Sequence, residues 1–137
     1  MSTDPRLSLE PTASLETILD GAWWPRTADA VAELPGLIDA LTSRHGTITH
    51  VLLNSADWAE PHPRDIHAGG RTVRLGWYTS QPTGLLTMII DFNRARVDLL
   101  VVPQKATADS AATAMTAAAS AGNTKRAGAL LADIKVG

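Results

Sequence analysis

The residues best suited to bind a ligand lie in one short segment, Asp20–Arg26, with the sequence D-G-A-W-W-P-R. Adjacent residues of a strand point to opposite faces, so Trp23 and Trp24 cannot both enter the same side of a sheet. If both indoles fill core volume and cover a sheet edge, with Arg26 stacked on one of them, the segment is structural. If one indole is exposed, it offers apolar contact area beside an anion-binding guanidinium. The residue types favour the structural interpretation and leave the binding interpretation open.

Two aspartates could perform acid–base chemistry if folding brought them together. Asp20 opens the tryptophan segment, and Asp57 precedes a third tryptophan, Trp58. Two carboxylates about 5–9 Å apart can act as an acid and a base. However, aspartate before glycine is a common turn former, and Asp57 suits the cap of a loop. The structural interpretation is therefore preferred for both residues.

Basic and aromatic residues are mixed along Arg71–Tyr78, where Arg74 and Trp77 are the candidates for contact with a ligand. This composition can bind single-stranded nucleic acid by stacking and phosphate contact. In a regular strand, however, Arg74 and Trp77 fall on opposite faces. A solvated Arg74 and a core Trp77 are the preferred interpretation.

Two histidines, His62 and His67, flank Asp65 and could in principle hold a divalent metal. Their spacing matches no established metal motif, and loop histidines are usually solvated. Phosphate-binding loops, dinucleotide fingerprints and nucleophile elbows are missing from the sequence. We therefore predict no metal, no cofactor and no catalytic residue.

The elements that would position these residues follow from periodicity and turn signals. A helix is expected after Thr27 or Asp29, with Gly46 ending it, and a second is expected from Thr107 or Asp109 to Ser120. The segment 54–70, which contains Pro61 and Pro63, is expected to be an exposed loop. Strands are expected over residues 6–9, 22–24, 47–54, 73–78, 85–92 and 97–102.

Strands and helices follow one another without a strict strand–helix–strand alternation. That order predicts an α+β fold, with a mainly antiparallel sheet of about five to six strands and two principal helices packed on one face. The links 81–84 and 93–95 are of hairpin length, which favours antiparallel pairing of the strands they join.

Length and composition predict one domain over residues 1–137, with an ordered core of about 6–120 and a short helix and tail over 121–137. The chain has no cysteine, which excludes a disulfide framework and suits a reducing compartment. No secretory signal and no apolar stretch of spanning length is present, so we expect a cytoplasmic protein that makes no contact with a membrane. The net charge of −2 argues against nucleic acid as a partner.

The segment D-G-A-W-W-P-R resembles a family of small uncharacterised actinobacterial proteins. Four further strings support the resemblance, namely R-L-S-L-E-P at Arg6, A-E-L-P at Ala32, R-T-V-R-L-G-W at Arg71 and L-L-V-V-P at Leu99. The resemblance covers about residues 6–120. Because the family is a domain of unknown function, it implies one cytoplasmic domain and no activity, cofactor or catalytic residue.

Two functions follow as expectations. The first is a non-catalytic binding or interaction module that self-associates or binds a protein partner. The alternative is a small-molecule or anion-binding protein, conceivably an enzyme, with a pocket lined by tryptophan and arginine. The residues expected to contact a ligand or partner are Asp20, Trp23, Trp24, Arg26, Trp58 and Arg74.

Overall fold

A computed structural model of the chain describes residues 6–9, 19–68, 70–91, 95–119, 130–131 and 134. The predicted short helix and tail over 121–137 fall almost entirely outside these residues. The elements are β1 (Leu7–Leu9), β2 (Gly21–Trp23), α1 (Ala30–His45), β3 (Ile48–Asn54), the 3-10 turn η1 (Ser55–Asp57), β4 (Asp65–Ala68), β5 (Arg71–Tyr78), β6 (Leu85–Ile90), β7 (Ala95–Val101) and α2 (Ala108–Ala118).

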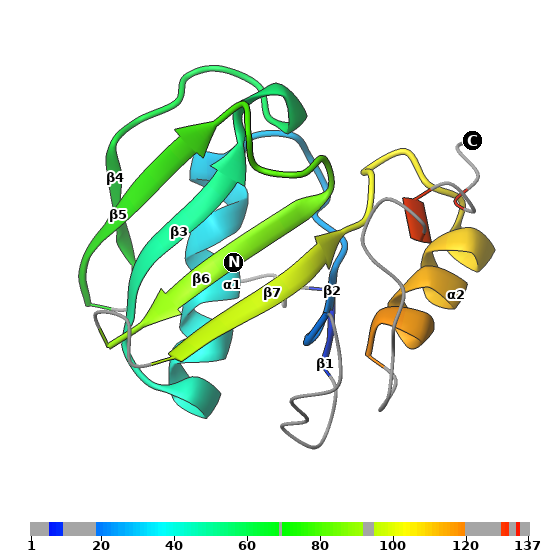
Figure 1. Cartoon of the computed structure of the whole chain (residues 1–137), viewed down its shortest axis with the longest axis horizontal. Coiled ribbons are helices and arrows are strands. Elements are labelled where there is room, and N and C mark those ends of the chain that lie inside the picture. Colours follow the sequence, from blue (N-terminus) through cyan, green and yellow to red (C-terminus); the bar gives the residue numbers. More distant parts are fainter. Residues whose placement is uncertain are drawn as a thin grey trace.

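The strands form a seven-stranded mixed sheet in the order β1-β2-β7-β6-β3-β5-β4 (Figure 1). Strand β2 pairs in parallel with β7, and β3 pairs in parallel with β5, while the other four pairings are antiparallel. The fold is α+β as predicted, but the expectation of a mainly antiparallel sheet of five to six strands is wrong. The sheet is mixed because β2 lies parallel to β7 and β3 lies parallel to β5, and the chain between the strands of each pair is long enough for the crossover that parallel pairing needs.

Helix α1 begins where the side chain of Asp29 accepts hydrogen bonds from the N–H groups of Val31 and Ala32. Pro35 lies inside the helix and does not delay its start. The helix ends at Gly46, which adopts a positive φ of 109°. The predicted start and end are thus confirmed, and Val31 near the start of the helix is 40% exposed.

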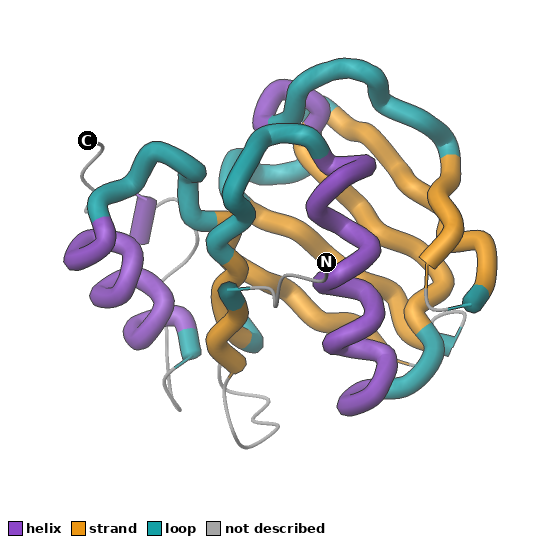
Figure 2. The backbone as a smooth tube through the Cα atoms, turned by 180° about the vertical axis from the view of Figure 1, so that it is seen from behind, coloured by secondary structure: helices purple, strands orange, loops and turns teal. Residues whose placement is uncertain are grey.

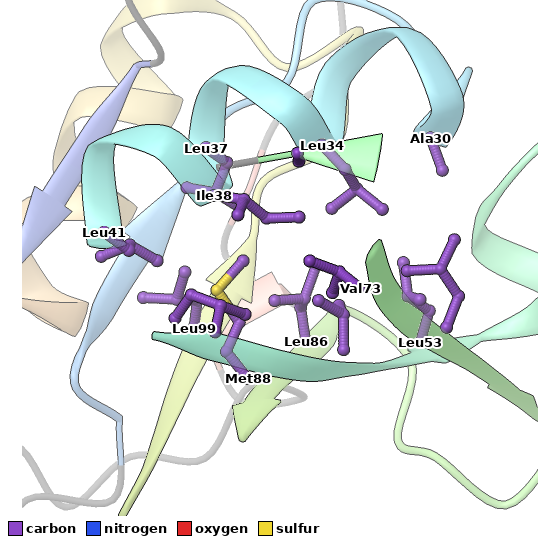
Figure 3. Close-up of a cluster of buried hydrophobic side chains, with 14 of the residues drawn as sticks. Ala30, Leu34, Leu37, Ile38, Leu41, Leu53, Val73, Leu86, Met88 and Leu99 are labelled. Atoms are coloured by element: carbon purple, nitrogen blue, oxygen red, sulfur yellow. The ribbon is translucent and has the colours of Figure 1, made fainter. Parts of the chain in front are cut away.

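The larger core lies between α1 and one face of the sheet. Leucines and an isoleucine of α1 pack against alternate residues of β3, β5, β6 and β7, as Figure 3 shows for Leu34, Leu37, Ile38 and Leu41 above Leu53, Val73, Leu86, Met88 and Leu99. The period of two in these strands directs every second side chain to this face. The alternation read from the sequence therefore identifies the buried face of most strands.

Helix α2 packs on the opposite face of the sheet. Its buried Ala111, Ala114 and Ala118 join a second cluster with Ala22 of β2 and Leu100 of β7, whereas the neighbours Trp23 and Leu99 belong to the α1 core. Figure 2 shows α1 across the centre of the sheet and α2 beside its β1–β2 end. The prediction that both helices pack on one face is therefore wrong. Within α2, Ala114 is buried and Ala112 is exposed.

Two local expectations differ from the structure. The segment expected to be a loop contains β4, whose four residues alternate between exposed and buried positions. The link 81–84 joins β5 to β6, but these strands are not neighbours because β3 lies between them. The link between β6 and β7 does join antiparallel neighbours, as predicted.

Candidate ligand-binding cleft

Asp20 and Gly21, the first residues of the D-G-A-W-W-P-R segment, contact the strands on either side of β2, namely β7 and β1. The carboxylate of Asp20 accepts a hydrogen bond of 2.8 Å from the backbone N–H of Asp98, and the Asp20 N–H donates to the Asp98 carbonyl. Gly21 lies so close to β1 that a Cβ atom there would collide with the carbonyl oxygen of Ser8. The glycine is therefore required for strand pairing, and the predicted turn at Asp20-Gly21 is instead the beginning of β2.

The two adjacent indoles point to opposite faces, as the strand geometry predicts. Trp23 is buried in the α1 core, where its ring stacks on Trp58 with ring centroids 5.5 Å apart. Trp24 is half-buried against the second cluster, and its indole N–H donates to the carbonyl of Pro103 at 3.0 Å. Both tryptophans therefore hold structural elements together.

The cation that stacks on the outer indole is Arg6, in place of the expected Arg26. The Arg6 guanidinium lies 3.8 Å from the centre of the Trp24 ring and donates to the carbonyls of Trp24 and Pro25. Partial burial and the nearby charge of Arg26 lower the pKa of Arg6, while Glu33 opposes this effect. Arg26 is exposed, and its backbone N–H donates to the carboxylate of Glu33. Arg6 was missed because no local pattern marks a contact across eighteen residues.

Strand β5 separates its basic and aromatic residues, as predicted. Arg74 is exposed on the face opposite α1, while Trp77 packs against the α1 core and donates its indole N–H to Pro63. Arg74 is thus not part of a shared surface with Trp77. The neighbouring Tyr78 is 49% exposed and its ring lies over Gly76.

The histidine-rich segment is distributed over separate structures. The His62 ring stacks on Trp77 at 4.2 Å, and its Nε2 lies 3.0 Å from the carbonyl of Trp58. Asp65 and His67 are exposed residues of β4. Among the described residues, no group of three or more histidine or acidic side chains is placed to hold a metal ion.

Asp20 and Asp57 are not brought together. The Asp20 carboxylate accepts a hydrogen bond from the backbone N–H of Asp98. The Asp57 carboxylate accepts a 2.8 Å hydrogen bond from the N–H of Gly84, and the Gly84 carbonyl accepts one from the N–H of Val101. Asp98 and Val101 are three residues apart on β7, a span of about 10 Å. The two aspartates therefore serve different connections, and they do not form the carboxylate pair considered from the sequence.

Asp57 instead lies at a cleft of about 200 Å³ at one edge of the sheet. Strands β2, β7, β3 and β5 run in one direction, so their carboxyl ends meet at this edge. The chain connections that follow these strands form the walls. The described lining residues are Pro25, Thr27, Ala28, Asp57, Trp58, Thr83, Gly84, Val101, Val102, Pro103, Gln104 and Leu131.

The charge of the cleft comes from Asp57. It is the only titratable side chain among the described lining residues. Burial raises the pKa of the Asp57 carboxyl, and the hydrogen bond from Gly84 works in the opposite direction. The cleft therefore combines mainly apolar walls with one half-buried carboxylate, a combination suited to a ligand with a small polar group and an apolar body.

Of the residues predicted to contact a ligand, Trp58 lines the cleft and Trp23 supports it from behind. Arg26 lies between the lining residues Pro25 and Thr27 and is not itself a lining residue, while Asp20, Trp24 and Arg74 lie elsewhere. Sequence reasoning missed the lining role of Gly84, Pro103 and Leu131. The adjacent pair Asp57-Trp58 was the one feature of the sequence that pointed to this region of the cleft.

The fold and the site define an α+β protein with a small cleft at the carboxyl edge of a mixed sheet. Residues 6–118 match the family described as Family of unknown function (DUF5994), and the chain belongs to that family. No curated protein and no solved structure matches this chain. Within the described residues, no helix combines the length and the apolar character needed to cross a membrane.

Proposed function

We propose that this protein is a binding module that holds a small molecule in the cleft beside Asp57. The observation that carries the proposal is the half-buried carboxylate in a cleft where four chain connections converge. An asparagine at position 57 could accept the same hydrogen bond from Gly84 without the cost of burying a charge. A carboxylate in that place is better explained by a ligand than by packing.

The ligand site differs from the tryptophan- and arginine-lined pocket expected from the sequence. Trp58 is shared, but the charged group is an aspartate, and no cationic side chain is among the described lining residues. This charge disfavours the anion-binding form of the earlier expectation.

The proposal is tested by titrating small neutral, cationic and anionic aromatic compounds into the ¹⁵N-labelled protein and following its amide resonances. We expect shifts that cluster at Thr27, Trp58 and Gly84. The variant Ala28→Leu places a larger side chain in the cleft and should abolish these shifts while the remaining spectrum stays that of the folded protein. If no compound moves the cleft amides of the wild-type protein, the proposal is wrong.

Self-association is a second candidate function, favoured by the face of the sheet opposite α1. No described helix covers this face over β3, β5 and β6, where Leu52 and Ile89 are half-exposed beside Tyr78. Cross-strand neighbours there include Asp65 with Arg74, so both charge signs are available to a second copy. Sedimentation equilibrium of the wild type and of Tyr78→Glu tests this candidate. A wild-type dimer weakened by the substitution supports it, and a wild-type monomer at millimolar concentration contradicts it.

Three further expectations belong to this proposal. The protein acts in the cytoplasm, which the absence of cysteine suits. Its relatives are actinobacterial, and the D-G-A-W-W-P-R segment recurs among them. Fluorescence microscopy of a tagged chain and an alignment of family members test these expectations.

A further inference from the structure

We infer that the cleft takes a small organic cation, an amine whose ammonium group meets the Asp57 carboxylate and whose apolar body packs against the walls. The inference deepens the proposed function and rests on it. It names a chemical class for the ligand, and the charge, the size and the wall composition of the cleft each contribute an independent argument.

The hydrogen bonding of Asp57 favours a cationic ligand. An ionised carboxylate has two oxygens and about four acceptor positions. Within the described part of the chain, the backbone N–H of Gly84 is its hydrogen-bond partner, at Oδ2. No other described lining residue is titratable, so none of the lining residues that the structure describes supplies a cation to neutralise the charge of Asp57. An ammonium group supplies both the missing donors and the opposite charge.

The volume of the cleft limits the size of the ligand's apolar body. A dry cavity of about 150 Å³ is large enough to hold benzene. The cleft of about 200 Å³ therefore accommodates one ring and a short arm carrying the amine. A nucleotide or a peptide of several residues is too large to be enclosed there.

The walls of the cleft offer apolar and aromatic contacts to the body of the ligand. Val101 and Leu131 supply apolar surface, and Trp58 adds an aromatic ring next to Asp57 in the sequence. Trp58 is itself held by stacking on the buried Trp23, so this wall is fixed before the ligand arrives.

The experiment uses three probes of nearly equal shape and different charge: benzylammonium, benzyl alcohol and benzoate. Each is titrated into the ¹⁵N-labelled full chain at pH 7 and low ionic strength, with the Gly84 amide as the reporter because it donates to Asp57. We expect benzylammonium to bind at least about tenfold more tightly than benzyl alcohol, since hydrogen bonds to charged groups are roughly twice as strong as neutral ones. Benzoate should bind most weakly of the three.

Two variants that each exchange a carboxylate for an amide distinguish the site from the general charge of the protein. Asp57→Asn keeps an acceptor for the Gly84 N–H and removes the charge in the cleft. We expect it to lose the preference for benzylammonium over benzyl alcohol, while the affinity for the alcohol stays within about twofold of wild type. Asp65→Asn removes the charge of an exposed β4 residue outside the cleft and should leave all three affinities unchanged.

The outcomes separate the inference from the proposed function. If benzyl alcohol or benzoate binds the cleft as tightly as benzylammonium, the ligand is not a cation, and the proposed binding function still stands. The same conclusion follows if Asp57→Asn retains the cation preference. If none of the probes moves the cleft amides, the inference and the proposed function both fail.

Discussion

The guanidinium of Arg6 lies 3.8 Å from the centre of the Trp24 ring and fastens the N-terminal strand to the chain that follows β2. It donates hydrogen bonds to the carbonyls of Trp24 and Pro25, while the Trp24 indole N–H binds Pro103. Pro25 and Pro103 both line the cleft. This contact therefore positions two walls of the proposed binding site from a residue outside it.

Arg6→Ala should destabilise the protein, because it removes two hydrogen bonds and the cation over the Trp24 ring. We expect a loss of about 1–3 kcal/mol in the free energy of unfolding, measured by chemical denaturation. Arg6→Lys retains the charge without the planar group and should lose less than the alanine variant.

The matched control is Arg26→Ala, which keeps the backbone N–H that donates to Glu33. We expect this exposed position to cost less than about 0.5 kcal/mol. An equal loss in the two alanine variants would show that Arg6 has no special part in holding Trp24.

Gly21→Ala should detach β1 from β2, because the new Cβ would collide with the backbone of Ser8 and only separation of the strands relieves the contact. We expect a loss of about 1–3 kcal/mol, the usual cost of overpacking. Hydrogen exchange at the Trp24 N–H, which donates to the Arg6 carbonyl at 2.8 Å, reports the separation directly.

Gly76→Ala is the comparison for Gly21, since both glycines lie in strands. A Cβ at Gly76 meets the flexible ring of Tyr78, which can move aside. Exchange at the Trp24 N–H should remain slow in this variant. Slow exchange in Gly21→Ala as well would contradict the close approach of β1.

The sequence predicted local features because they depend on local rules. The alternation in Arg71–Tyr78 separated a solvated Arg74 from a core-facing Trp77, and Asp29 and Gly46 marked the ends of α1. Four-residue β4 was missed because prolines and glycines flank it, and those residues usually indicate a loop.

Strand order and helix placement could not be predicted in the same way. Pairing of β2 with β7 joins residues far apart in the chain, and β3 separates β5 from β6 although a short link connects them. Such pairings depend on the whole core and not on turn composition. The cleft could not be predicted from the sequence for the same reason. Asp57, Gly84 and Pro103 approach one another only when the carboxyl ends of the strands meet.

Asp57→Asn should change how stability depends on pH. Burial raises the pKa of Asp57 in the folded protein above its value in the unfolded chain, so the folded state holds this proton more tightly. Lowering the pH through the folded pKa toward the unfolded value near 3.8 therefore stabilises the wild type relative to Asp57→Asn. Above the folded pKa the difference no longer depends on pH, and the wild type carries the full cost of the buried charge.

The measurement for Asp57 is the free energy of unfolding of both proteins between pH 4 and pH 7. The difference between them should shift in favour of the wild type as the pH falls. Asp65→Asn is again the control, because it exchanges a carboxylate for an amide at an exposed residue outside the cleft. A difference for Asp57→Asn that moves in favour of the variant on acidification would mean that the carboxylate is stabilised, and not penalised, by its surroundings.

Gly84→Ala should damage the cleft in two separable ways. Gly84 has a φ of 76°, and a Cβ there would also collide with the side chain of Leu131. Gly70→Ala measures the backbone cost alone, because Gly70 has the same φ and a new Cβ there meets nothing within 4 Å. We expect Gly70→Ala to lower the free energy of unfolding by about 1–2 kcal/mol. Gly84→Ala should lose more stability than Gly70→Ala, because of the collision with Leu131. Adding Leu131→Ala removes the collision, so the double variant should lose less stability than the sum of the two single variants, by about 0.5–3 kcal/mol. Strict additivity, measured by denaturation of the four proteins of this cycle, would show that Leu131 does not pack over Gly84 at the wall of the cleft.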